Sequence, residues 1–159
     1  MNTLIVYDTH HGCTEKYIQI LAKELSGDIQ IHHLKNKSKS NIESFDTIII
    51  GGSIHAGKIQ GSVKKFCSKY QKILIQKKLG LFICCMEENG KAINQFEDNY
   101  PHALRHHASA KGIFAGELNF DSMNALEKFI IKKIAKTEKS ISKFSEKPAI
   151  QFIHDLTSN

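Results

Sequence analysis

Short apolar runs alternate with amphipathic segments from one end of the chain to the other. A run that is apolar at every position is typical of a strand buried on both faces, as in a parallel sheet. Parallel strands need crossover connections, which are usually helices. The alternation therefore predicts an α/β fold, a three-layer sandwich with helices on both faces of a five-stranded parallel sheet. The expected strands are residues 3–7, 47–50, 81–85 and 113–115, with a short alternating segment at 29–31.

The segments between these strands carry apolar residues three and four positions apart, which is the spacing of an amphipathic helix. We expect helices within residues 14–25, 63–73 and 92–100, and a closing helix with Pro148 in its first turn. No internal repeat and no change in composition divides the chain. Residues 1–159 are therefore predicted to form a single domain.

One further helix, at about 122–135, has two interpretations. The first, which we favour, is a core helix with a solvated lysine face, whose inward residues are Leu126, Ile130, Ile131 and Ile134. The second is a helix that lies on an anionic membrane surface through its lysines, Lys128, Lys132, Lys133 and Lys136.

The composition of the chain indicates which kinds of partner it is expected to bind. The chain has 41% hydrophobic and 24% charged residues, the balance of a globular protein. Its net charge of +6 comes almost entirely from lysines, and Arg105 is the only arginine. Because arginine is favoured for reading bases and phosphates, we do not expect nucleic acid as a partner. No apolar run approaches the roughly 20 residues of a membrane span, and no signal-peptide pattern is present, so we expect a cytoplasmic protein.

Cysteines and histidines raise the question of a metal site. The cysteines form no CxxC pair and are expected to be reduced thiols in the cytoplasm: Cys13, Cys67, Cys84 and Cys85. Several histidines are close neighbours in the sequence, namely His32, His33, His102, His106 and His107. Neighbouring histidines on elements of uncertain placement are weak support for coordination, so no metal is predicted.

Three loops follow the carboxyl ends of expected strands, where ligands bind in open α/β sheets: residues 8–14, 51–57 and 86–90. The first leads directly into a helix, whose N-terminus offers backbone N–H groups and partial positive charge. Thr9 and Thr14 add hydroxyl groups, and Gly12 allows a close backbone approach. This loop predicts a terminal-phosphate site, but it matches neither the dinucleotide nor the triphosphate loop pattern.

The run 5–15 resembles the FMN-phosphate loop of flavodoxins, a hydroxyl residue followed by x-x-Gly-x-Thr. The segments 50–57 and 114–120 are similar to the flavodoxin-domain branch that contains the quinone-linked, FMN-dependent protoporphyrinogen oxidases of bacteria. The resemblance implies strand order 2-1-3-4-5, FMN as cofactor, and electron transfer from a substrate through FMN to an acceptor, with protoporphyrinogen and a quinone as the implied pair.

The resemblance also implies which residues bind the cofactor. In the first loop these are Thr9, His10, His11, Gly12, Cys13 and Thr14. In the second they are Gly51, Gly52, Ser53, Ile54, His55, Ala56 and Gly57, with Gly51 and Gly52 letting the backbone approach the flavin. In the third they are Met86, Glu87, Asn89 and Gly90.

Individual residues of these loops carry more specific expectations. At least one of His10 and His11 is expected to touch the ligand, and Cys13 to donate its backbone N–H. The chain has no Trp and no aromatic residue in the third loop, so His55 or Met86 is expected beside the flavin ring. No residue is expected to act as a general acid or base.

Three functions follow from this reading. The first is an FMN-dependent oxidoreductase that resembles protoporphyrinogen oxidase and makes peripheral contact with a membrane. The second is a carrier flavodoxin that moves electrons between proteins. The third is a flavodoxin-fold binding module without FMN. The sequence does not indicate an oligomeric state.

Overall fold

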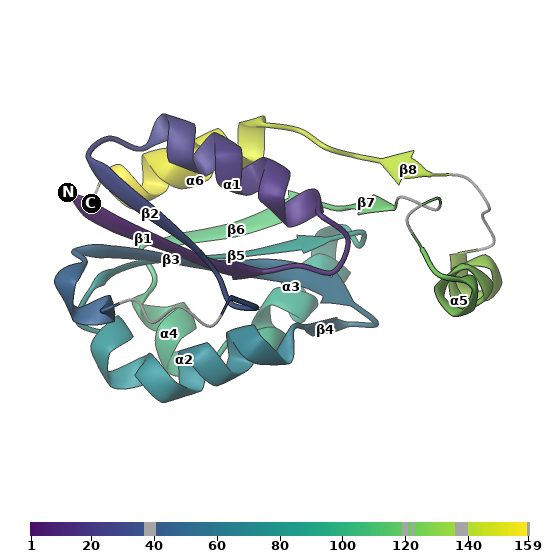
Figure 1. Cartoon of the computed structure of the whole chain (residues 1–159), viewed down its shortest axis with the longest axis horizontal. Helices are drawn as coiled ribbons and strands as arrows, with labels where there is room; N and C mark the ends of the chain where they lie inside the picture. The colour runs from purple at the N-terminus through teal and green to yellow at the C-terminus, as the bar shows by residue number, and fades with distance from the viewer. Residues whose placement is uncertain (37–40, 119–120, 122, 136–139, 159) are drawn as a thin grey trace.

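Five parallel strands form the central sheet of the chain, which was analysed as a computed structural model describing residues 1–36, 41–118, 121, 123–135 and 140–158. The spatial order is β2-β1-β3-β5-β6, so the predicted order is confirmed (Figure 1). The strands are β1 (Asn2–Asp8), β2 (Asp28–His33), β3 (Thr47–His55), β5 (Lys78–Cys85) and β6 (Ala110–Ala115).

Helices cover both faces of this sheet (Figure 1). One face carries α1 (Cys13–Glu24) and α6 (Lys147–Thr157), and Pro148 lies in the first turn of α6 as predicted. The other face carries α2 (Gly61–Leu74), α3 (Asn89–Asn99) and the short helix α4 (His102–His107), which the sequence analysis missed. A short 3-10 helix, η1 (Ile42–Ser44), precedes β3.

The pleat of β1 explains how one strand serves two cores. Leu4 and Val6 belong to the cluster with α2 and α3, whereas Ile5 and Tyr7 belong to the cluster with α1 and α6. Successive side chains of a strand point to opposite faces, so a run without polar residues is required when both faces are covered. This confirms the buried central strand predicted from residues 3–7.

The third strand is longer than predicted. It continues past Gly51 and Gly52 to His55 and then pairs antiparallel with β4 (Lys58–Ile59). Ala56 and Gly57 between them have φ of 48° and 76°, the left-handed conformation at both central positions of a tight hairpin turn. The predicted end at Gly51 was wrong because glycine was taken as a strand breaker, whereas here it makes room for a neighbouring side chain.

The segment after β6 leaves the core. It consists of β7 (Glu117–Leu118), α5 (Ala125–Ala135) and β8 (Ile141–Ser142), with β7 and β8 paired antiparallel. Figure 1 shows α5 beyond this small sheet, away from the central one. No helix in the described ranges has the length and apolar character needed to cross a bilayer.

The inward orientation predicted for this helix was wrong for Leu126 and Ile130, whereas Ile131 is half-buried. Leu126 is 67% exposed and Ile130 is 43% exposed, and Phe129 beside them is 56% exposed. The predicted helix is present, but Leu126, Phe129 and Ile130 are left exposed by the described part of the chain. Lys136 and residues 119, 120 and 122 lie outside the described residues, and the structure describes the backbone but not the side chain of Ile134.

Candidate functional site

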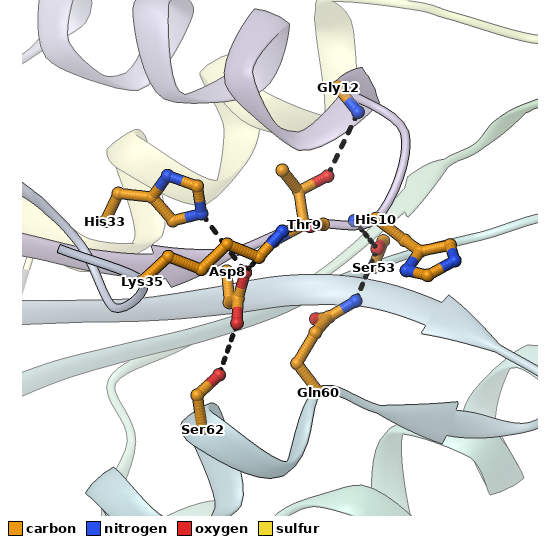
Figure 2. A network of polar contacts seen from close by, with 9 residues as sticks. All are labelled: Asp8, Thr9, His10, Gly12, His33, Lys35, Ser53, Gln60 and Ser62. Atoms are coloured by element: carbon orange, nitrogen blue, oxygen red, sulfur yellow. Dashed lines mark hydrogen bonds and ion pairs between the residues drawn. The ribbon is translucent and has the colours of Figure 1, made fainter. Parts of the chain in front are cut away.

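The first two predicted loops meet at the carboxyl edge of the sheet. Asp8 and Gly52 are partners in the register of β1 and β3, which brings the residues that follow them side by side. The backbone N–H of His10 donates to Ser53 Oγ over 3.2 Å, and Gln60 Nε2 donates to the same oxygen over 2.7 Å (Figure 2). The structure therefore joins the first loop to the end of β3.

A buried carboxylate lies under the first loop. Asp8 is 4% exposed and accepts hydrogen bonds from Ser62 Oγ, from His33 Nε2 over 3.1 Å, and from the Thr9 N–H over 2.7 Å (Figure 2). Burial alone would raise the pKa of Asp8, but these hydrogen bonds and Lys35 Nζ at 3.6 Å lower it. The carboxylate therefore ties β1 to β2 and to the start of α2.

The sequence analysis did not assign this role to Asp8. Its only signal was an acidic residue at the end of an otherwise apolar strand. That signal indicates a buried, paired carboxylate, because an unpaired one would be costly there. Its partners come from β2 and α2, and their approach depends on the tertiary structure.

The backbone of the first loop is held at several points. Lys35 Nζ donates to the Thr9 carbonyl over 2.9 Å, and the Gly12 N–H donates to Thr9 Oγ1 over 3.3 Å. Gly12 has φ of 85°, a left-handed conformation that favours glycine, and it directly precedes α1. Among the described residues, no side chain caps this end of α1.

Thr14 lies in the first turn of α1 and is fully buried. Its Oγ1 makes no hydrogen bond of good geometry within the described chain, although the Cys84 thiol is near enough to interact with the Thr14 side chain. The buried hydroxyls of Thr3 and Thr47 also lack a partner among the described residues, so the missing partner alone does not indicate a ligand. Thr14 differs from them because it lies at the N-terminus of a helix. An anion at the α1 N-terminus would accept the hydroxyl hydrogen and would also suit the partial positive charge there.

Three histidines from the two loops lie close together: His10, His11 and His55. The ring centroids of His10 are 4.5 Å from those of both His11 and His55, and one ring nitrogen from each residue lies within 4.8 Å of the others. Burial, together with the neighbouring His10 and His55, lowers the pKa of His11, although Glu127 opposes this shift.

Glu127 reaches this cluster from α5. Its Oε1 lies 2.8 Å from His10 Nε2, and its Oε2 lies 3.7 Å from His11 Nε2. The hydrogen bond from His10 lowers the pKa of the Glu127 carboxyl. Glu127 was missed because a glutamate on a lysine-rich helix looks like an ordinary surface residue.

The side chain of Cys13 points into the core, where it is 6% exposed and packs in the same cluster as Cys84. A hydrogen bond with the Cys84 thiol is the main cause that lowers the pKa of Cys13, whereas burial raises that of Cys84 well above its usual value. The side chain is therefore turned away from the loop, and donation of the Cys13 backbone N–H to a ligand stays a prediction.

Gly51 and Gly52 have a packing role that the sequence analysis did not foresee. A Cβ on Gly51 would lie 2.0 Å from the Phe82 ring, and one on Gly52 would lie 2.6 Å from Gln60 Oε1. Both glycines are buried inside β3. Their contact with a flavin stays a prediction. Beyond them, Ser53 and Ile54 are half-buried, and the hairpin residues are exposed: His55, Ala56 and Gly57.

The third loop lies beside a separate hollow. A cavity of about 400 Å³ is lined by residues of this loop, of α3 and of β6: Glu87, Glu88, Asn89, Ala92, Ile93, Ile113, Phe114 and Ala115. Asn89 has φ of 53° where α3 begins, next to Gly90. Met86 is half-buried beside Gly116, and whether it or His55 neighbours a flavin ring stays a prediction.

The fold of this chain is similar to that of several solved flavodoxins. The flavodoxin 1 of Bacillus cereus superposes with a TM-score of 0.62 at 15% identity, covering 100% of this chain and 99% of that chain. A short-chain flavodoxin associated with a non-canonical PDU bacterial microcompartment gives 0.65 at 13% identity, covering 99% and 98%. The flavodoxin of Streptococcus pneumonia TIGR4 gives 0.57 at 15% identity, covering 99% of both chains.

At these identities the similarity to solved structures shows the fold alone. No curated protein sequence gives a significant match. The family model described as a flavodoxin domain matches residues 4–145, which is most of the chain. The chain therefore belongs to the flavodoxin domain family, and membership of this family implies FMN as the cofactor.

Proposed function

We propose that the chain is an electron-transfer flavoprotein that holds the FMN phosphate at the N-terminus of α1. The observation that carries this proposal is the buried Thr14 hydroxyl, which makes no hydrogen bond of good geometry among the described residues. It lies in the first turn of a helix that directly follows a left-handed glycine. A phosphate there would accept the hydroxyl hydrogen and the backbone N–H groups of the first turn.

The residues in and around the first loop would have different roles in binding FMN. Thr14 and the α1 N-terminus would hold the phosphate, and Gly12 leaves room for its oxygens. Ser53 fixes the loop through the His10 N–H, and Asp8 fixes the strand end beneath it. The bound FMN would supply reversible electron uptake, while the protein supplies position and charge. No protein side chain needs to exchange a proton with substrate in this proposal.

For the substrate, we propose a reduced porphyrin of the protoporphyrinogen class, with a quinone as electron acceptor. Two observations support this finer proposal. The segments 50–57 and 114–120 resemble the branch that contains the protoporphyrinogen oxidases. In addition, α5 exposes Leu126, Phe129 and Ile130 next to lysines, on a helix that contacts the first loop through Glu127. Such a surface suits a cytoplasmic protein that meets a quinone at an anionic membrane.

A carrier flavodoxin without a small-molecule substrate is the second candidate. It is supported by the near-complete, two-way coverage between this chain and flavodoxins of similar size. A carrier would dock protein partners at the loops instead of binding a porphyrin. The flavin-free binding module is disfavoured by the unpaired Thr14 hydroxyl, which a phosphate would satisfy.

The phosphate site is tested by titrating the flavin-free chain with FMN and with riboflavin. Thr14→Ala removes a hydrogen bond to a charged group, worth about 1.5–3 kcal/mol. FMN affinity should therefore fall roughly 10- to 150-fold, whereas riboflavin affinity should not change. The matched control is Thr47→Ala, which removes another buried, unpaired hydroxyl at the opposite edge of the sheet. Equal FMN affinity in wild type and Thr14→Ala would refute the phosphate assignment.

The substrate is tested under anaerobic conditions with the FMN-loaded chain. Protoporphyrinogen should bleach the visible absorbance of the oxidised flavin, and an added quinone should restore it. Replacing the exposed apolar residues, in Leu126→Ser with Phe129→Ser, should slow recovery by quinone in vesicles more than bleaching by porphyrinogen. Bleaching by a reduced protein carrier but not by porphyrinogen would select the carrier instead.

A further inference from the structure

We propose that His10, His11 and His55 form a binding site for a first-row divalent cation, with Zn²⁺ as the preferred ion and Glu127 as an outer carboxylate. The site uses imidazoles from both loops, whereas the proposed phosphate position is at Gly12 and Thr14. No flavin atom takes part, so this inference does not depend on the proposed function.

The geometry already brings the three imidazoles near coordination distance. One ring nitrogen from each lies within 4.8 Å of the other two. Around a tetrahedral zinc with bonds of about 2.0–2.1 Å, ligand nitrogens are roughly 3.4 Å apart. His10 and His55 are exposed, so rotation of their rings can close this gap without moving the sheet. His11 is half-buried and serves as the fixed member.

Two polar observations point to a cation here. His11 Nε2 is buried and makes no hydrogen bond within the described residues, and its nearest carboxylate oxygen, Glu127 Oε2, is 3.7 Å away. Glu127 Oε1 lies 2.8 Å from His10 Nε2, which is the arrangement in which a carboxylate orients a ligating imidazole and leaves its other nitrogen for the metal. A carboxylate beside these imidazoles favours a positive ion between them.

The donor set indicates the class of ion. Three imidazoles with an open fourth position are typical of zinc, and imidazole also suits Cu²⁺ and Ni²⁺. Mg²⁺ and Ca²⁺ prefer oxygen ligands and are not expected to bind. The site would link the first loop to the tip of the β3–β4 hairpin, and through Glu127 to α5.

The test is Zn²⁺ binding to the full-length chain near pH 7.5, measured by competition with a chromogenic chelator. Loss of an outer-shell partner alone costs about 10- to 100-fold in affinity, so we expect His55→Ala to cost about 100-fold or more. Glu127→Gln should cost about 10-fold. Circular dichroism confirms that each variant is folded, and His55 is suited to substitution because it lies on an exposed hairpin.

The matched control removes a different pair of histidines. His102 and His106 lie one helical turn apart on α4 with ring centroids 5.3 Å apart, a spacing that could also hold an ion. The double variant His102→Ala with His106→Ala should keep wild-type Zn²⁺ affinity. As a second readout, bound Co²⁺ should give the intense visible bands of a tetrahedral site in wild type and lose them in His55→Ala.

The proposal is overturned if His55→Ala binds Zn²⁺ as tightly as wild type. It is also overturned if the α4 double variant abolishes binding, because the ion would then be held on α4. Weak binding that no single histidine substitution alters would mean nonspecific association with the surface, which likewise refutes the site.

Discussion

The helices α1 and α5 have similar amphipathic sequences but different surroundings. On α1, Tyr17, Ile18 and Leu21 are at most 1% exposed. Tyr17 stacks on Phe114 at 4.7 Å between centroids, and its hydroxyl donates to the Ala115 carbonyl over 2.9 Å. On α5, Leu126 and Phe129 are more than half exposed. An apolar stripe therefore predicts a helix, but it does not say what covers the stripe.

The contacts that hold α5 in place are polar, whereas α1 is held by apolar packing. Asn124 and Glu127 form a reciprocal cap at the start of α5, with distances of 2.9 Å and 3.1 Å. Glu127 also contacts His10 on the first loop. Two ion pairs connect the residues on either side of α5 to the rest of the chain. Lys16 pairs with Glu117 at 2.7 Å, and Lys143 pairs with Glu88 at 2.6 Å. Exposed ion pairs of this kind contribute little stability each.

The largest expected effect separates the two helices directly. Leu21→Ala removes a fully buried side chain from the α1 core and should lower the free energy of unfolding by about 2–5 kcal/mol. Leu126→Ala on α5 should change it by no more than about 0.5 kcal/mol. Urea denaturation of both variants gives the comparison. Equal losses would show that α5 packs on a core in solution.

The second prediction concerns the loop in front of α1. Asp8→Asn leaves the Ser62, His33 and Lys35 groups without a charged partner and should cost about 1–3 kcal/mol at pH 7. The pKa of Asp8 in the folded state is lower than its usual value of 3.8. The ionised carboxylate therefore stabilises the fold in full at pH values above 3.8. This contribution is lost as pH falls through the lowered folded-state pKa.

The pH profile provides the measurement for Asp8. The difference between wild type and Asp8→Asn in unfolding free energy should stay constant from pH 7 to pH 5 and shrink below about pH 3.8. Asp28→Asn, at the exposed start of β2, serves as the control and should cost little at any pH. A difference between wild type and Asp8→Asn that grows towards acid would contradict the assignment.

The smallest effect on global stability is expected for the contact between Glu127 on α5 and His10 in the loop before α1. Glu127→Ala removes the cap of α5 and its bond to His10, but both are exposed, so the urea midpoint should hardly move. Limited proteolysis should instead cut the chain near α5 several-fold faster, because α5 opens without the rest. Glu97→Ala, which breaks an exposed pair with Arg105, should leave both measurements unchanged. A midpoint shift as large as that of Leu21→Ala would contradict this separation.

The prediction from sequence was most successful where a pattern reflects a local physical requirement. Strands buried on both faces must be apolar throughout, which is why residues 3–7 and 81–85 were recognisable. The helix predicted to follow the loop with Gly12 and Thr14 is also present, as α1, while the anion site at its N-terminus stays a prediction. The strand end predicted at Gly51 was wrong because this position must be glycine to make room for the ring of Phe82, which lies on the neighbouring strand.

The sequence by itself determined the α/β class, the five parallel strands and the loop that leads into α1, because each depends on spacing within a short segment. Only the tertiary structure decided that Asp8 would gather partners from β2 and α2, that His55 would lie against His10 and His11, and that α5 would stand away from the sheet. These contacts join residues far apart in the chain, and their energies depend on the strand register and helix packing that bring them together.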